Sequence, residues 1–159
     1  MTATAPTPMP EFAAREGGCQ CGALRYRLIA PPLELYACHC RDCQKQSSSA
    51  FGMSLIVAPA ALEWLRGEPK IWSVRADSGA LKRCAFCADC GSRVYHAAED
   101  AEDSADSAAP ISIKAGTLDD TSWLRPSAHL WTSRAQPWVH LDAARFDLHG
   151  QEPDDDSRA

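Results

Sequence analysis

The sequence lacks any apolar run long enough to cross a bilayer. Its longest apolar stretch, residues 50–62, is interrupted by Ser54 and Pro59 and is shorter than the ~20 residues that a membrane helix needs. The first ten residues have neither a basic start nor an apolar core, so we expect no secretory signal and a cytoplasmic location. Lys and Arg are not clustered, and we therefore expect no nucleic-acid partner.

The net charge of −5 is unevenly distributed along the chain. Nine of the 21 acidic residues lie in two short segments, Glu99, Asp100, Glu102, Asp103 and Asp106 in one and Glu152, Asp154, Asp155 and Asp156 in the other. The rest of the chain has 12 acidic and 15 basic residues. A weakly basic remainder favours a small anionic ligand, although a solvated surface is the ordinary explanation for such a charge.

A chain of 159 residues is long enough for one domain with a real core. Residues 1–16 are rich in Pro, Thr and Ala, and we expect a disordered tail there. The domain is predicted to span residues 17–150, with an acidic surface insertion at 97–109 and an acidic tail at 151–159.

Short alternating segments between frequent turns predict a mainly β domain with little helix. We expect residues 44–50 to form a loop or a short helical turn and residues 59–65 to form one helical turn. Two aromatic-rich pieces, 128–131 and 138–141, surround Pro137. The predicted strands are residues 24–28, 35–40, 51–57, 71–74, 81–86, 93–96 and 111–114.

Eight cysteines are the most unusual feature of the composition. Cys38 and Cys40 are two apart on an expected strand, so both sulfurs point to one face, and a turn brings Cys43 back to the same point. Four disulfides are the alternative, but without an export signal the thiols should stay reduced, and closely spaced thiols then indicate zinc ligands.

The remaining cysteines are spread over two further segments. Cys87-Ala88-Asp89-Cys90-Gly91 is a zinc-knuckle pattern, in which two thiols flank a tight turn and Gly91 can take the positive φ that follows. Cys19 and Cys21 form another Cys-x-Cys pair. Cys84 is either an extra ligand or a spare half-buried thiol, and we favour the spare thiol.

The sequence resembles the glutathione-dependent formaldehyde-activating enzyme family over about residues 17–148. The similarity is carried by Gly18-Cys19-Gln20-Cys21-Gly22-Ala23-Leu24-Arg25-Tyr26, Cys38-His39-Cys40-Arg41-Asp42-Cys43, Phe86-Cys87-Ala88-Asp89-Cys90-Gly91-Ser92, Ala115-Gly116-Thr117-Leu118-Asp119-Asp120, His129-Leu130-Trp131 and Pro137-Trp138. The resemblance implies a β-tent fold of several small coiled antiparallel sheets built around zinc.

The resemblance also implies two zinc ions, one structural and one catalytic. Cys19, Cys21, Cys87 and Cys90 match the structural site, and Cys38, Cys40 and Cys43 match the catalytic site. Four protein ligands close a tetrahedron, whereas three leave a position for an incoming thiol. The implied reaction is the addition of glutathione to formaldehyde, or a related small aldehyde, and its reverse is a carbon–sulfur lyase reaction.

Arg41 and Lys45 flank the expected open zinc position and either hold a carboxylate of glutathione or are surface charges. His39 falls between two ligands and should point to the opposite face of its strand, as a packing or hydrogen-bonding residue. A structural role is the default for His129 and His140, and the five tryptophans are expected in the core or at its rim.

Two function classes follow from these motifs. One is a zinc-dependent thiol–aldehyde synthase or carbon–sulfur lyase with a small-molecule thiol and aldehyde as partners. The other is a zinc-stabilised glutathione carrier or protein-interaction module, because a vertebrate centromere protein uses the same scaffold without catalysis. The discriminating feature is the incomplete second site, since a purely structural role gives no reason to leave zinc one ligand short.

Overall fold

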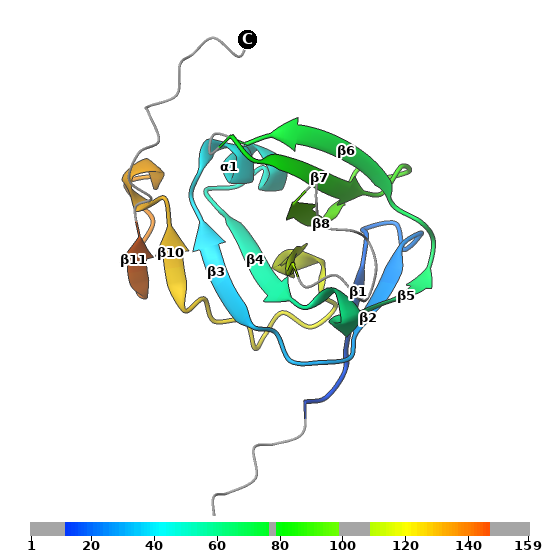
Figure 1. Cartoon of the computed structure of the whole chain (residues 1–159). Helices are drawn as coiled ribbons and strands as arrows, with labels where there is room; N and C mark the ends of the chain where they lie inside the picture. Colours follow the sequence, from blue (N-terminus) through cyan, green and yellow to red (C-terminus); the bar gives the residue numbers. More distant parts are fainter. Residues whose placement is uncertain (1–11, 77–78, 99–108, 147–159) are drawn as a thin grey trace, which may run out of the picture.

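The computed structural model describes residues 12–76, 79–98 and 109–146, and these form a mainly β domain (Figure 1). The strands are β1 (Arg15–Gly18), β2 (Arg25–Leu28), β3 (Glu34–Cys38), β4 (Gly52–Val57), β5 (Leu62–Arg66), β6 (Lys70–Arg75), β7 (Leu81–Phe86), β8 (Arg93–Ala98), β9 (Ile111–Lys114), β10 (Ala128–Leu130) and β11 (Ala144–Phe146). One α-helix, α1 (Arg41–Ser47), and three 3-10 turns, η1 (Pro59–Ala61), η2 (Ala115–Thr117) and η3 (Thr132–Arg134), complete the described part. The predicted fold class is confirmed.

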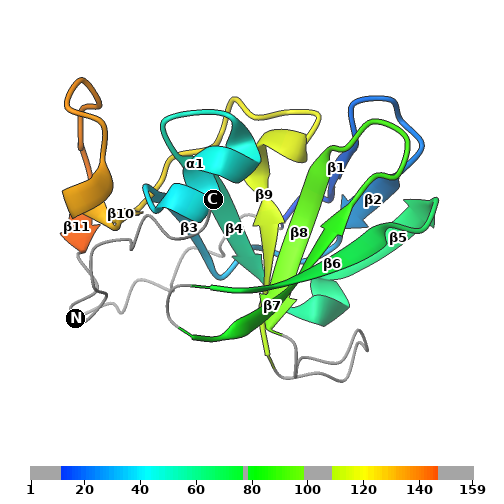
Figure 2. The same cartoon turned by 90° about the horizontal axis from the view of Figure 1, so that it is seen from above.

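The strands form two sheets. The smaller sheet has the order β1-β2-β5, and the larger has the order β11-β10-β3-β4-β9-β8-β7-β6. Most neighbours are antiparallel, but β10 pairs in parallel with both β3 and β11. The larger sheet is strongly coiled, so that β6 and β7 run across the direction of β3 and β4 (Figures 1 and 2).

One face of the larger sheet packs against the smaller sheet and makes the core. Register places Leu55 beside Leu35 and Ile113, and Ile113 beside Tyr95. All four are buried in one hydrophobic cluster with Leu28 and Tyr26 from β2. Because side chains alternate along a strand, the residues between these ones point to the opposite face.

A short motif after β9 fastens the two sheets together. The Tyr26 hydroxyl lies 2.8 Å from Thr117 Oγ1, and Arg25 forms an ion pair with Asp119. Gly17 lies against this contact, because a Cβ there would sit 2.5 Å from the Tyr26 hydroxyl. Thr117 and Asp119 belong to the Ala115–Asp120 run that carries the family resemblance, and in this structure they serve the packing of the sheets.

The strand predictions in the middle of the chain are confirmed to within a few residues, whereas four strands, β1, β5, β10 and β11, were missed. β1 begins inside the segment predicted as a tail, β5 occupies most of the segment predicted as a helical turn, and β11 follows the second aromatic-rich piece. Residues 44–50 do contain helix, as the second half of α1. Residues 1–11, 99–108 and 147–159, which hold the predicted tails and most of the acidic insertion, lie outside the described residues.

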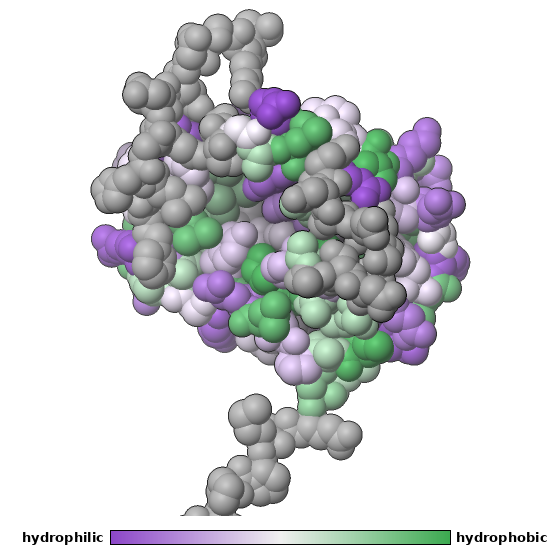
Figure 3. Space-filling view, in the orientation of Figure 1, coloured by the Kyte–Doolittle hydropathy of each residue, from purple (hydrophilic) through white to green (hydrophobic). Residues whose placement is uncertain are grey.

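No helix in the described ranges is long and apolar enough to cross a membrane. Hydrophobic residues on the face seen in Figure 3 are scattered among hydrophilic ones rather than gathered in one field.

Candidate metal centres

Two groups of cysteines bring their sulfurs together. Cys19, Cys21, Cys87 and Cys90 form the first group, and Cys38, Cys40 and Cys43 form the second. Within each group all Sγ atoms lie within 4.8 Å of one another. All eight cysteines are free thiols, and Cys84 belongs to neither group.

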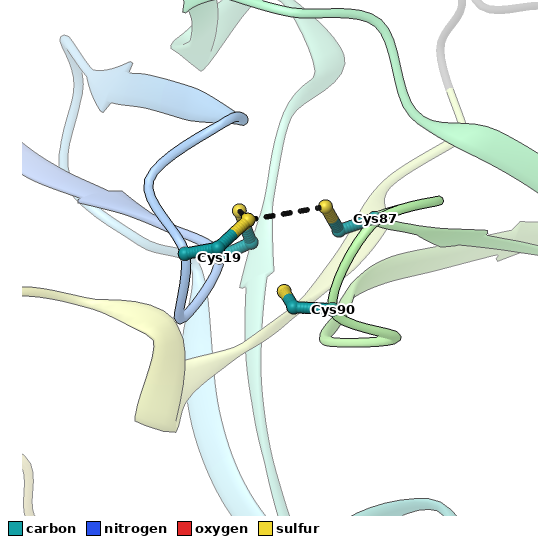
Figure 4. Close-up of side chains that lie close together, drawn as sticks. Cys19, Cys87 and Cys90 are labelled. Carbon is teal, nitrogen blue, oxygen red and sulfur yellow. Dashed lines mark hydrogen bonds between the residues drawn. The ribbon is translucent and has the colours of Figure 1, made fainter.

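The first group joins two turns that are far apart in the sequence. Cys19 and Cys21 follow β1, whereas Cys87 and Cys90 flank the turn between β7 and β8, and their side chains turn toward a common point (Figure 4). The turn closes as a knuckle through a hydrogen bond from Gly91 N to Cys87 O, with Gly91 at φ +74°. The hydrogen bond from Gln20 N to Ser92 Oγ fastens the two turns directly.

The sulfur spacings of the first group fit a tetrahedral zinc. Cys19 and Cys21 are 3.5 Å apart at Sγ, and Cys21 and Cys87 are 3.7 Å apart. Zn–S bonds of about 2.3 Å at tetrahedral angles separate neighbouring sulfurs by about 3.8 Å. The Ser92 side chain and backbone lower the pKa of Cys90 to about 5, which favours the thiolate form that a metal requires.

The second group is built where β3 runs into α1. Cys38 ends β3, and Cys40 is the N-cap of α1, whose sulfur accepts a hydrogen bond from Cys43 N at 3.4 Å. Gln44 fixes the connection between β3 and α1, because its Nε2 donates to His39 O at 2.7 Å and to Arg134 O at 3.1 Å. A Cβ on Gly52 would lie 3.4 Å from Cys43 Cβ, so α1 approaches β4 closely at this point.

The close approach of three thiols in the second group favours the binding of a cation. Hydrogen bonds from Cys38 and Cys43 lower the pKa of Cys40 to about 2, while the same contact with Cys40 raises the pKa of Cys38. The thiolate of Cys40 is thus stabilised, and the ionisation of Cys38 is disfavoured, because adjacent negative charges repel. A soft divalent metal removes that penalty, and three sulfur donors suit zinc.

His39 lies between two of these cysteines and points away from them, as expected. It is fully buried, and its Nε2 lies 3.0 Å from Nδ1 of His129 on β10. His129 Nε2 lies 3.2 Å from Asp142 Oδ1, and because a carboxylate only accepts, His129 donates to it and accepts from His39. His129 is therefore a satisfied structural histidine. His140 is exposed.

The other residues singled out in the sequence have varied positions. Cys84 is 1% exposed, more deeply buried than expected. Arg41 and Lys45 are exposed and four residues apart on α1. Among the tryptophans, Trp64 packs against Tyr26 and Tyr95, while Trp72 and Trp138 are exposed.

Sequence reasoning missed a set of polar side chains on the face of the larger sheet that is opposite to the core. They are Tyr36, Ser54, Lys82, Arg93, His96, Ser112 and Lys114. The alternation Ile111-Ser112-Ile113-Lys114 was a signal, because it separates an apolar face from a polar one. Nothing local in the sequence indicates that this polar face lies beside the second cysteine group.

The sequence model of the family described as glutathione-dependent formaldehyde-activating enzyme matches residues 14–134, which include every cysteine of both groups. The chain belongs to this family. A crystal structure of a Rhodobacter sphaeroides protein is similar at 17% sequence identity and a TM-score of 0.47, over 70% of this chain and 91% of that one. Membership of the glutathione-dependent formaldehyde-activating family associates the chain with glutathione and formaldehyde as small-molecule substrates.

Proposed function

We propose that this protein adds the thiol of glutathione to formaldehyde or a related small aldehyde, giving S-hydroxymethylglutathione in the case of formaldehyde, and catalyses the reverse carbon–sulfur cleavage. One observation carries the proposal. The first cysteine group offers four ligands, whereas the second offers three, with no fourth Cys, His, Asp or Glu grouped with it among residues 12–76, 79–98 and 109–146. Four ligands suit a structural zinc, and three suit a site that admits a substrate.

Cys38, Cys40 and Cys43 would hold the catalytic zinc, and Cys19, Cys21, Cys87 and Cys90 would hold the structural zinc. A zinc held by three thiolates, with one open position, would lower the pKa of an incoming thiol and so favour its thiolate form. In the reaction the sulfur forms a bond to the carbonyl carbon, the carbon–oxygen π bond breaks, and the oxygen takes up the proton that the thiol loses.

The residues around the second group would orient the substrates. Arg41 and Lys45 lie exposed on α1, which contains Cys43, and we propose that they contact a carboxylate of glutathione. His39 and Gln44 hold the chain on either side of Cys40, through the hydrogen bond to His129 and the bonds to backbone carbonyls. This packing keeps the three sulfurs in place before a ligand arrives.

The test is calorimetry of glutathione and S-methylglutathione against the zinc-loaded protein and its Cys40→Ala variant. Two remaining thiolates hold zinc far more weakly than three, so the variant should keep one zinc and lose glutathione binding. S-methylglutathione should bind the wild-type protein much more weakly, because its sulfur cannot become a thiolate. The matched control is Cys84→Ala, which removes a thiol that belongs to neither group.

A turnover assay with glutathione and a panel of aldehydes completes the test, with product detected by NMR. Equal affinity for glutathione and S-methylglutathione would contradict the zinc–thiolate mechanism. Tight glutathione binding without any adduct would favour the carrier or interaction module instead.

A further inference from the structure

The face of the larger sheet that turns away from the core is polar and cationic beside the second cysteine group. Cys38 shares this face with Tyr36, two residues earlier on β3. Register then carries the face across the sheet through Ser54, Lys114, Ser112, His96, Lys82 and Trp72. Arg93 is on the same face, because a register shift beside Phe86 turns it from the side of Tyr95 to lie over the Trp72 ring. We call this surface the cationic face.

The cationic face lies beside the second cysteine group. Tyr36 lies opposite Ser54 and Ser54 opposite Lys114, while Cys38, two residues after Tyr36, lies opposite Gly52 at one end of these strands. Tyr95 on β8 lies opposite Ile113 on β9, so Arg93, two residues before Tyr95, is at the same end of the sheet as Cys38. Only β4 and β9 separate β8 from β3.

Three polar atoms on this face are buried and have no partner. They are Arg93 Nε and Nη2 and Ser112 Oγ. The Arg93 guanidinium lies over the Trp72 ring at 5.6 Å, which fixes its plane but uses none of its N–H donors. An unsatisfied buried donor is costly, more so when it is charged, and such atoms are commonly completed by a ligand.

Apart from the cysteines, the charged side chains around Arg93 on this face are cationic. Burial, followed by the charges of Lys114, Lys82 and Arg93, lowers the pKa of His96 well below its ordinary value. Lys114 Nζ lies 2.9 Å from His96 Nδ1, so the amine donates to a neutral imidazole. In the described part of the chain no carboxylate forms an ion pair with Arg93, Lys82 or Lys114.

We propose that the cationic face binds a carboxylate of the thiol co-substrate, with Arg93 as its principal contact. The inference rests on the proposed function, because it names where the thiol that reaches the second cysteine group is held. The guanidinium fork matches a carboxylate in two parallel hydrogen bonds, which would satisfy both orphaned nitrogens of Arg93. Glutathione has two carboxylates, so contacts with Arg93 and with α1 are compatible.

The experiment measures binding by calorimetry to the zinc-loaded full chain, with glutathione and with its diethyl ester, whose carboxylates are blocked. The variants are Arg93→Gln and Arg93→Lys. The matched control is Arg75→Gln, which makes the same charge change at an exposed position of β6 on the opposite face, where Arg75 Nη1 donates to Gly79 O. Zinc content and melting temperature are measured for every protein.

Arg93→Gln should weaken glutathione binding about tenfold or more, the usual scale for losing a charge-assisted pair. The glutathione affinity of Arg93→Lys should lie between those of Arg93→Gln and the wild type, because lysine keeps the charge but lacks the paired N–H donors of the guanidinium. Arg75→Gln should bind as the wild type does. The diester should bind the wild type weakly and should be insensitive to Arg93→Gln.

Three results would overturn the inference: unchanged glutathione affinity in a zinc-loaded Arg93→Gln protein, an equal loss for glutathione and the diester, or equal wild-type affinity for both ligands. The last comparison needs no variant, so it can overturn the inference even if Arg93→Gln does not fold, and Arg93→Lys is then the variant that separates Arg93 from the charges on α1. Arg93-dependent binding without any aldehyde adduct supports the inference and counts against the proposed function. Adduct formation together with unchanged glutathione binding in Arg93→Gln supports the proposed function and counts against the inference.

Discussion

His39 and His129 share a buried hydrogen bond, with His39 Nε2 and His129 Nδ1 3.0 Å apart. The bond joins the residue between two zinc-site cysteines to β10, which lies beside β3 in parallel register. The rings are also in contact, at 5.2 Å between centroids. The loop that holds Cys38 and Cys40 is thereby fastened to a segment 90 residues later in the chain.

We expect His129→Leu to destabilise the protein by about 1–3 kcal/mol, because it leaves the buried Nε2–H of His39 without an acceptor. The second zinc should also be released faster to a chelator, since its loop is less firmly held. Thermal unfolding and a chelator competition measure the two effects. Asp142→Asn is the control and should cost less than about 1 kcal/mol, because that carboxylate is 88% exposed. Equal unfolding temperatures for the two variants would contradict this account.

The zinc-loaded wild-type chain should contain two zinc ions, and Cys19→Ser should contain one. Structural zinc contributes about 10 kcal/mol or more to folding in small zinc domains, and losing even about 4 kcal/mol lowers Tm by roughly 10 °C at this size. Cys84→Ala should keep both ions, with a cost near about 1 kcal/mol for the lost packing. Metal analysis and calorimetry check both variants. A Cys19→Ser protein with two zinc ions and an unchanged Tm would show that the first group is not a metal site.

Stability should fall on acidification, in part through His96. Its pKa lies well below the ordinary value in the folded protein, chiefly because it is buried. Below about pH 6.5 the unfolded chain binds a proton at this residue and the folded chain does not. The free energy of unfolding therefore falls by up to about 1.4 kcal/mol for each pH unit of acidification. His96→Gln should therefore show a shallower loss between pH 6.5 and 5. Urea unfolding at saturating zinc, with metal content checked at each pH, measures the slopes, and parallel slopes would refute the assignment.

The acidic segment from residue 99 to 106 should be dispensable. It has no apolar periodicity and no candidate zinc ligand, and β8 is complete at Ala98 before it begins. Replacing it with a short Gly-Ser linker should leave zinc content and Tm near those of the wild type. The control is a linker of the same composition with the original acidic residues restored. Loss of metal or of soluble expression with both linkers would show that the segment packs on the domain, and a loss with the neutral linker alone would show that its charges are needed.

Short-range patterns in the sequence predicted the β class, most strands of the central region and the convergence of Cys38, Cys40 and Cys43. The grouping of Cys19 and Cys21 with Cys87 and Cys90 came from the family resemblance. Alternation marks a strand because successive side chains point to opposite faces, and Cys-x-Cys or Cys-x-x-Cys places sulfurs together over a few residues. β5 was missed because Pro59 and two alanines favoured a turn, which is present only as η1. β1 was missed because Arg15-Glu16-Gly17-Gly18 has no alternation of apolar and polar residues. β10 and β11 were missed because three residues are too few for a pattern.

The sequence by itself determined that Cys38, Cys40 and Cys43 lie close enough to share a metal, since that depends on thiol chemistry and spacing over a few residues. Tertiary structure alone decided what surrounds them. The parallel pairing of β10 with β3 brings His129 to His39, and the pairing of β8 with β9 brings His96 to Lys114. Only the folded structure shows that Arg93 has buried N–H donors without a partner. Strand order and sheet curvature are set by packing between distant segments and leave no local signal in the sequence.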